Sequence, residues 1–157
     1  MFRIGNGIDI HELINGSGFL LGGTLIEGKY AIKAHSDGDI LYHAISDALL
    51  GSISLGDIGE HFPDNSKKTE NMNSEDIFLF CLNKVYEMGY KISNIDSTIM
   101  LERPKLRPHI LKIRENIAQV ANLELDQISI KATTTEKLGY IGQGKGIQVH
   151  STCLIYK

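Results

Sequence analysis

The chain has only two cysteines in 157 residues, no apolar run long enough to span a membrane and no cluster of basic residues. Cys81 and Cys153 lack the spacing of a metal site, so we expect neither a zinc–thiolate centre nor a disulfide scaffold. We interpret both as small buried side chains. A net charge of −3 without a basic track gives no reason to expect a nucleic-acid partner. Without an 18-residue apolar segment or a signal peptide, we expect no membrane association and a cytoplasmic location.

The usual nucleophile and nucleotide-binding motifs are missing as well. No Ser-His-Asp or Cys-His set is convincing, and the glycine-rich run 142–146 lacks P-loop spacing because Ile147 follows its last glycine. A negatively charged protein without these motifs could still hold a phosphorylated substrate. It would need metals, backbone N–H groups and a few lysines to do so.

The length and the 42% apolar content fit one domain, residues 1–157. Hydrophobic periodicity predicts main strands over 2–12, 91–101, 128–132 and 147–156, a hairpin over 19–28, and helices over 38–51, 74–89 and 108–122. We expect Ser36 or Asp37 to cap the first helix. The alternation of strands and helices predicts an α/β (α+β) two-layer sandwich, with a mainly four-stranded mixed sheet and helices on one face. The polar, glycine-bearing stretch 52–73 is typical of a functional loop or lid.

Asp9, His11 and His43 form the strongest candidate site. Residues i and i+2 of a strand project from the same face, so Asp9 and His11 can point together, and His43 lies on the first helix. One carboxylate and two imidazoles make a three-ligand set typical of catalytic zinc, which keeps a fourth position open. The residues also allow a plainer interpretation, a turn cap and two structural histidines. Asp39 and Asp47, four residues either side of His43, could orient its ring or could serve as caps.

Four further runs carry possible chemistry. Glu136, after three threonines at a strand end, is a hard oxygen ligand suited to Mg²⁺, although threonine is also ordinary in strands. His35 and Ser36 precede a helix and could bind a phosphate or simply form a polar loop. Taken alone, the run 56–59 is better interpreted as a turn than as a polyol site. The run 100–106 likewise fits a plain connection better than a base-reading segment.

Together these runs resemble the family of 2-C-methyl-D-erythritol 2,4-cyclodiphosphate synthases, enzymes of the non-mevalonate isoprenoid pathway. The resemblance covers nearly the whole chain in order and is carried by residues 7–11, 34–39, 47–51, 55–59, 62–64 and 131–139. It implies a homotrimer with active sites between subunits. It also implies a lyase that cyclises 4-diphosphocytidyl-2-C-methyl-D-erythritol 2-phosphate and releases CMP.

The resemblance assigns roles by position. Asp9, His11 and His43 would hold Zn²⁺, Glu136 would help hold Mg²⁺ or Mn²⁺, and His35 and Thr134 would stabilise the transition state. The implied substrate-binding residues are Ser36, Asp57, Ile58, Gly59, Phe62, Pro63, Asp64, Met100, Leu101, Glu102, Arg103, Pro104, Lys105, Leu106, Ala132, Thr133, Thr135, Tyr140 and Gln143. Among them, Asp57 and Gly59 would hold the erythritol part, and 100–106 with Ala132 and Thr133 would form the cytidine pocket.

The chain departs from the family at two places near the implied trimer axis. Gln143 and His150 stand where the family often has an arginine and a glutamate that line a central cavity. Loss of the arginine puts binding of an isoprenoid diphosphate there in doubt. Three His150 side chains could form a pH-sensitive ring or an ion site, or only a polar lining.

Overall fold

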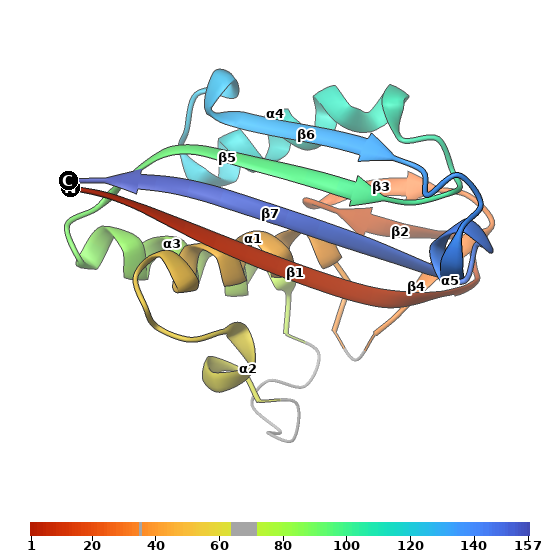
Figure 1. The fold of residues 1–157 in the computed structure, drawn as a ribbon, viewed down its shortest axis with the longest axis horizontal. Helices are drawn as coiled ribbons and strands as arrows, with labels where there is room; N and C mark the ends of the chain where they lie inside the picture. The colour runs from red at the N-terminus through yellow and green to blue at the C-terminus, as the bar shows by residue number, and fades with distance from the viewer. Residues whose placement is uncertain (35, 64–71) are drawn as a thin grey trace.

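A mixed five-stranded sheet organises the chain, as the computed structural model shows for residues 1–34, 36–63 and 72–157 (Figure 1). Its strand order is β4-β1-β7-β5-β6, and only the pair β5–β6 is parallel. The strands are β1 (Phe2–Asn15), β4 (Tyr30–Lys33), β5 (Lys91–Met100), β6 (Ile128–Thr133) and β7 (Gly146–Tyr156). A separate two-stranded sheet pairs β2 (Gly18–Leu21) with β3 (Thr24–Glu27).

The long helices lie on one face of the sheet (Figure 1). The α-helices are α1 (Ile40–Ser52), α2 (Ile58–His61), α3 (Ser74–Glu87), α4 (Ile110–Ala121) and α5 (Gly139–Gly142). Short 3-10 turns, η1 (Arg107–His109) and η2 (Leu125–Gln127), precede α4 and β6. No described helix is both long and apolar enough to cross a membrane.

The α+β class, the predicted hairpin and the one-sided helices are confirmed, but the four-stranded main sheet is wrong. The fifth strand, β4, pairs with the end of β1, from Glu12 opposite Lys33 to Asn15 opposite Tyr30. Residues 30–33 are too few to show a clear alternation, and β1 runs three residues beyond the predicted end at 12. Two short helices, α2 and α5, were also not predicted, because four residues carry no helical period.

The start of α1 also corrects the prediction. The helix begins at Ile40, and Asp39 caps it by accepting a hydrogen bond from the Tyr42 N–H. Ser36 and Asp37 instead accept bonds from the N–H groups of Gly38 and Asp39 and so shape the turn before the helix. The two proposed caps therefore lie three and two residues before the residue that caps the helix.

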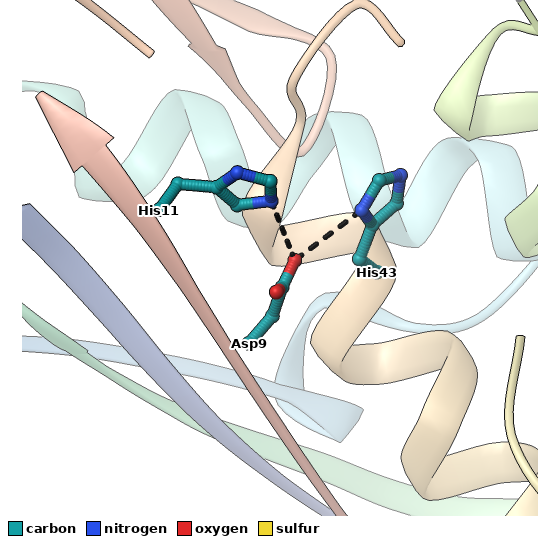
Figure 2. Close-up of side chains that lie close together, drawn as sticks. All are labelled: Asp9, His11 and His43. Carbon is teal, nitrogen blue, oxygen red and sulfur yellow. Dashed lines mark hydrogen bonds and ion pairs between the residues drawn. The ribbon is translucent and has the colours of Figure 1, made fainter. Parts of the chain in front are cut away.

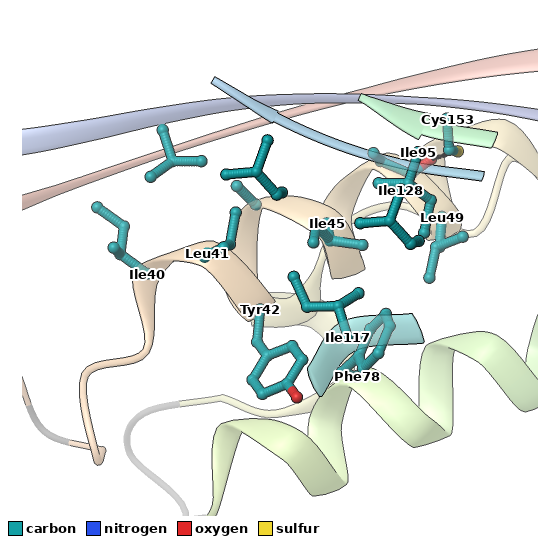
Figure 3. Packing of buried hydrophobic residues seen from close by; sticks show 14 of the residues in the cluster. Ile40, Leu41, Tyr42, Ile45, Leu49, Phe78, Ile95, Ile117, Ile128 and Cys153 are labelled. Atoms are coloured by element: carbon teal, nitrogen blue, oxygen red, sulfur yellow. Dashed lines mark hydrogen bonds between the residues drawn. The ribbon is translucent and has the colours of Figure 1, made fainter. Parts of the chain in front are cut away.

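One continuous core fills the space between the sheet and the helices, and α1 runs through it (Figure 3). Cys81 and Cys153 are free and fully buried in this core, as predicted, and burial raises the pKa of the Cys81 thiol to about 12. None of the long helices in the described part of the chain covers the other face of the sheet, and Ile4, Ile8 and Ile10 of β1 are 70%, 47% and 51% exposed there. Large apolar side chains in the open indicate a surface suited to another protein chain.

Two glycines let α1 rest directly on β1. A Cβ at Gly7 would lie 2.1 Å from the Ala44 carbonyl oxygen, and one at Gly5 would lie 1.7 Å from that of Ala48. No side chain fits at either position, so the helix backbone contacts the strand backbone. This close approach brings His43 of α1 within reach of the next inward-facing residue of β1, which is Asp9.

Candidate metal centre and substrate pocket

Asp9, His11 and His43 converge at one point, as the sequence predicted (Figure 2). Asp9 and His11 come from the helix-covered face of β1, and His43 comes from the first turn of α1. Their ligand atoms all lie within 4.8 Å of one another. His43 is buried and the other two residues are partly buried, so the group is accessible mainly from one side.

The separations suit a tetrahedral ion. Oδ2 of Asp9 lies 3.1 Å from Nε2 of His11 and 3.3 Å from Nδ1 of His43. Zinc bonds of about 2.0–2.1 Å at tetrahedral angles would put neighbouring ligand atoms about 3.3 Å apart. Two of the three edges therefore already have the length that zinc requires.

The outward nitrogens of both rings are engaged, which fixes what faces the centre. Nδ1 of His11 lies 3.3 Å from the Lys33 carbonyl oxygen, which can only accept, so this nitrogen carries the proton. Nε2 of His43 lies 2.9 Å from Oγ of Ser74. With these outward nitrogens as donors, the inward nitrogens and Oδ2 of Asp9 meet as three electron-rich atoms. Only a cation, either a metal ion or added protons, makes that arrangement favourable.

The electrostatics agree with this geometry. Burial alone would raise the pKa of Asp9, but hydrogen bonds from His11 and His43, and the charges of both rings, hold the pKa of that carboxyl well below its ordinary value. The hydrogen bond with Asp9 raises the pKa of His11 above its ordinary 6.5, against the opposing effect of burial. The site therefore attracts positive charge.

Neither Asp39 nor Asp47 orients the His43 ring. Asp39 is fully buried, and its carboxylate accepts hydrogen bonds from the N–H groups of Gly22, Gly23 and Tyr42. Oδ1 of Asp47 accepts from the Ile58 N–H at 2.8 Å and so holds α2 against α1. Asp39 therefore caps α1 and Asp47 holds α2 against it. Neither takes the role of orienting the His43 ring, which the sequence also allowed.

The second candidate metal ligand, Glu136, lies in a tight turn after β6. Glu136 and Lys137 both have left-handed backbone conformations, with φ of +51° and +67°. Oγ1 of Thr134 donates to Oε1 of Glu136 at 3.1 Å. Consecutive non-glycine residues in this region cost backbone energy and are typical of functional sites. The structure thus brings Thr134 and Glu136 together, but Glu136 is not part of the Asp9–His11–His43 group.

A cavity of about 580 Å³ opens beside the end of β6. Its walls come from the connection after β5, the start of α4 and the last residues of β6. It is lined by Leu101, Pro104, Lys105, Leu106, Arg107, Ile110, Leu111, Arg114, Ile130, Lys131, Ala132, Thr133 and Thr134. Four of these side chains are cationic in a chain of net charge −3, which favours a ligand that carries phosphate.

The sequence prediction covered half of this cavity. Of the predicted pocket residues, Leu101, Pro104, Lys105, Leu106, Ala132 and Thr133 line it, whereas Met100, Glu102 and Arg103 are not among its described lining residues. It missed the wall that α4 and η1 supply, together with Ile130 and Lys131 of β6. The amphipathic start of α4 was visible in the sequence, but nothing there showed that it lies against the end of β6.

The remaining predicted substrate residues lie mainly in two segments, one around α2 and one between β6 and β7. Asp57 caps α2, which contains Ile58 and Gly59, and Phe62 follows that helix and packs edge-on against Phe80 at 5.0 Å. Thr135 donates to the Leu138 carbonyl, Tyr140 donates to Gln148, and Gln143 ends α5. Pro63 follows Phe62, Ser36 lies in the turn before α1, and His35 and Asp64 lie outside the described residues. The predicted turn at 56–59 is therefore a capped helical turn.

The fold and this centre define an α+β protein with a candidate metal triad of two histidines and one carboxylate, and with a separate cationic pocket at the end of β6. Residues 2–156 match the sequence profile of the YgbB family, and the chain belongs to that family. A 2-C-methyl-D-erythritol 2,4-cyclodiphosphate synthase of Chloroherpeton thalassium is 50% identical over 156 residues, which cover 99% of each chain. One from Clostridium perfringens is 48% identical over 155 residues, with 99% of each chain covered. The resemblance seen in the sequence is thereby confirmed.

Solved structures agree with these relatives. The bifunctional IspDF of Campylobacter jejuni is 42% identical with a TM-score of 0.94, and the match covers 99% of this chain and 42% of that longer one. IspF of Plasmodium falciparum, solved as a CDP complex, is 36% identical with a TM-score of 0.87, and the match covers 98% of this chain and 95% of that one. The five-stranded fold is therefore a fold of this family.

Proposed function

We propose that this chain is a cyclodiphosphate synthase of isoprenoid precursor biosynthesis, a phosphorus–oxygen lyase with residues 1–157 as one catalytic domain. The substrate would be 4-diphosphocytidyl-2-C-methyl-D-erythritol 2-phosphate. An oxygen of its 2-phosphate attacks the β-phosphorus, the bond between that phosphorus and the CMP oxygen breaks, and the cyclic diphosphate and CMP leave. The convergence of three ligand atoms within 4.8 Å, in a chain of this family, carries the proposal.

The metal ligands suit this reaction because it joins two anionic groups. Two negative groups about 4 Å apart repel by ~1 kcal/mol in water and by ~4 kcal/mol at an effective dielectric of 20. Asp9, His11 and His43 would hold Zn²⁺, and Glu136 would help hold Mg²⁺ or Mn²⁺; bound there, such ions supply a template and a Lewis acid for the phosphates. The donor set of two imidazoles and one carboxylate fits zinc, and a carboxylate beside threonine hydroxyls fits Mg²⁺.

The chain's other residues would bind and orient the substrate. Thr134, held against Glu136, would donate to the reacting diphosphate, and His35 with Ser36 would bind phosphate oxygens. Asp57, Ile58 and Gly59 would hold the erythritol hydroxyls. The substrate supplies its own nucleophile, so the protein needs none.

The cationic cavity would hold the cytidine nucleotide. CDP-bound structures of relatives support a nucleotide ligand for those proteins. Pro104, with Leu101 and Ala132, would offer a rigid apolar wall to the base, and Lys105 would face its phosphates. Thr133, Thr135, Tyr140 and Gln143 would supply the remaining substrate contacts. They lie at the end of β6 and in the segment after it.

We also propose a homotrimer, with each active site between two subunits, and a cytoplasmic location. The sheet order places β1 three strand intervals from β6, about 14 Å at ordinary strand spacing. A neighbouring subunit that packs against the exposed face of the sheet would place its own nucleotide cavity beside this chain's triad. The exposed isoleucines of β1 support such a contact.

Two other functions remain as competitors, a binding module without turnover and a zinc phosphohydrolase. A hydrolase needs a general base beside a bound water, but Asp37, Asp39 and Asp47 all accept hydrogen bonds from protein groups. Incubation with the cytidylated substrate, followed by ³¹P NMR, separates the three. We expect CMP and the cyclic product; linear hydrolysis product would support the hydrolase, and unchanged substrate would support the module.

A further inference from the structure

Ser74 connects His43, a proposed metal ligand, to the exposed carboxylate of Asp37. It is the first residue of α3, it is fully buried, and its Oγ lies 2.9 Å from Nε2 of His43. The same Oγ donates a hydrogen bond to Oδ1 of Asp37, and the Ser74 backbone N–H donates to Oδ2 of Asp37 at 3.1 Å. The start of α3 therefore meets α1 and the turn before it at one hydroxyl.

The direction of each hydrogen bond follows from the groups involved. A carboxylate only accepts, so the Ser74 hydroxyl proton points to Asp37. The lone pairs of Oγ then remain for the Nε2–H of His43. This chain of bonds keeps the proton on Nε2 and leaves Nδ1 of His43 free to face Asp9.

We propose that Ser74, backed by Asp37, is a positioning residue that sets the tautomer and orientation of His43 at the metal centre. The inference rests on the metal site proposed above and deepens it. Partners of a metal-bound imidazole typically change metal affinity or activity by about 10–100-fold when they are removed. The hydrogen bond to Ser74 also joins α3 and the turn after Ser36 to the centre, so both segments become part of its support.

The test compares zinc affinities, measured by competition with a chromogenic chelator, and the visible absorption of the Co²⁺-substituted protein. We expect Ser74→Ala to weaken zinc binding about 10–100-fold and to change the Co²⁺ bands, because His43 loses its fixed orientation. Asp37→Asn should weaken binding less, since the amide oxygen still accepts from Ser74. Ser74→Thr keeps the hydroxyl and should bind zinc more tightly than Ser74→Ala.

Ser52→Ala is the matched control. Ser52 is also a buried serine, it ends the helix that carries His43, and its hydroxyl donates to the Leu49 carbonyl, away from the triad. It should lower thermal stability without changing zinc affinity. Equal zinc affinity in Ser74→Ala and wild type, or equal losses in Ser74→Ala and Ser52→Ala, would overturn the inference.

Two further outcomes are separable. If Ser74→Ala does not fold, Asp37→Ala decides, because it removes the acceptor that directs the Ser74 hydroxyl proton, and zinc affinity equal to wild type in Asp37→Ala would overturn the inference. If wild type itself binds no zinc, or binds it as well as His11→Ala does, the metal site is wrong. In that case the proposed function fails, rather than the role of Ser74 alone.

Discussion

At the scale of single residues, Asp9, His11 and His43 form one centre because each turns one polar atom toward the other two. The Ile10 N–H occupies one oxygen of Asp9 at 2.8 Å, and the outward ring nitrogens of His11 and His43 are bound by Lys33 and Ser74. What remains of each residue points to the same place. A centre built in this way is sensitive to small chemical changes that leave the fold alone.

Asp9→Asn and His11→Ala should therefore abolish turnover while the protein stays folded. Both side chains are partly exposed and lie at the end of the core, so their loss leaves no large cavity. We expect turnover at least about 100-fold below wild type, since each variant removes one of the three proposed metal ligands. Steady-state CMP release measures the loss, and circular dichroism with zinc content measures fold and metal. Wild-type rates in a zinc-free variant would contradict the proposed role of the triad.

The pKa shifts of Asp9 and His11 predict how pH affects the stability of the metal-free protein. The folded pKa of His11 lies above 6.5, so its favourable contribution is complete below pH 6.5 and is lost as pH rises through the folded pKa. The folded pKa of Asp9 lies below 3.8, so its contribution is present above pH 3.8 and is lost only in stronger acid. The pair therefore stabilises the EDTA-treated protein most between pH 3.8 and 6.5.

Melting temperatures of the EDTA-treated protein from pH 6 to 8.5 test this expectation. The difference between wild type and His11→Asn should shrink as pH rises, because asparagine does not titrate. With saturating zinc the trend should reverse, since protons compete with the metal at low pH. A difference that grows with pH in the absence of metal would contradict the expected sign.

At the scale of elements, the contact between α1 and β1 sets the position of the centre. Gly5 and Gly7 on the strand face Ala44 and Ala48 on the helix, and backbone meets backbone. Small residues spaced by two on a strand and by four on a helix are visible in the sequence. These small residues allow a close contact only if the two elements are neighbours in the fold, and the sequence alone does not show which elements become neighbours.

Gly7→Ala should separate α1 from β1 and so move His43 away from Asp9. The added Cβ would lie 2.1 Å from the Ala44 carbonyl oxygen, so a backbone must shift. We expect a loss of about 3 kcal/mol in the free energy of unfolding, in the range of overpacked cores, and weaker zinc binding. Chemical denaturation and chelator competition measure the two effects.

Gly28→Ala is the control for this change, because a Cβ at Gly28 meets no atom within 4 Å. It should leave both stability and zinc binding close to wild type. Equal behaviour of the two alanine variants would show that the close contact does not position the metal centre.

The elements also show why the sequence predicted some features and not others. The long strands, the three long helices and the pairing of Asp9 with His11 follow from local periodicity, which one sequence contains. The fifth strand at 30–33, the α4 wall of the cavity and the contact between Ser74 and His43 depend on which segments become neighbours. Asp39 shows the same limit, since its spacing from His43 suggested the ring but its partners are Gly22 and Gly23 of the hairpin.

At the scale of the whole molecule, one chain carries its triad and its cationic cavity on different parts of its sheet. The triad lies on β1 and α1, and the cavity lies at the end of β6. The proposed function makes them the two halves of one active site. If neighbouring subunits pair these halves, activity should require two different chains at each site. Mixtures of two inactive variants can detect this arrangement.

We expect His11→Ala and Ala132→Phe to be inactive alone, the first without a metal ligand and the second with its nucleotide cavity filled. Co-expressed with different tags and purified through both, they should form mixed trimers. In every trimer that carries both variants, one of the three shared sites combines an intact triad with an intact cavity. Light scattering checks the trimer, and CMP release checks the recovered activity. Trimers of mixed composition that stay as inactive as their parents would place each complete site within one subunit.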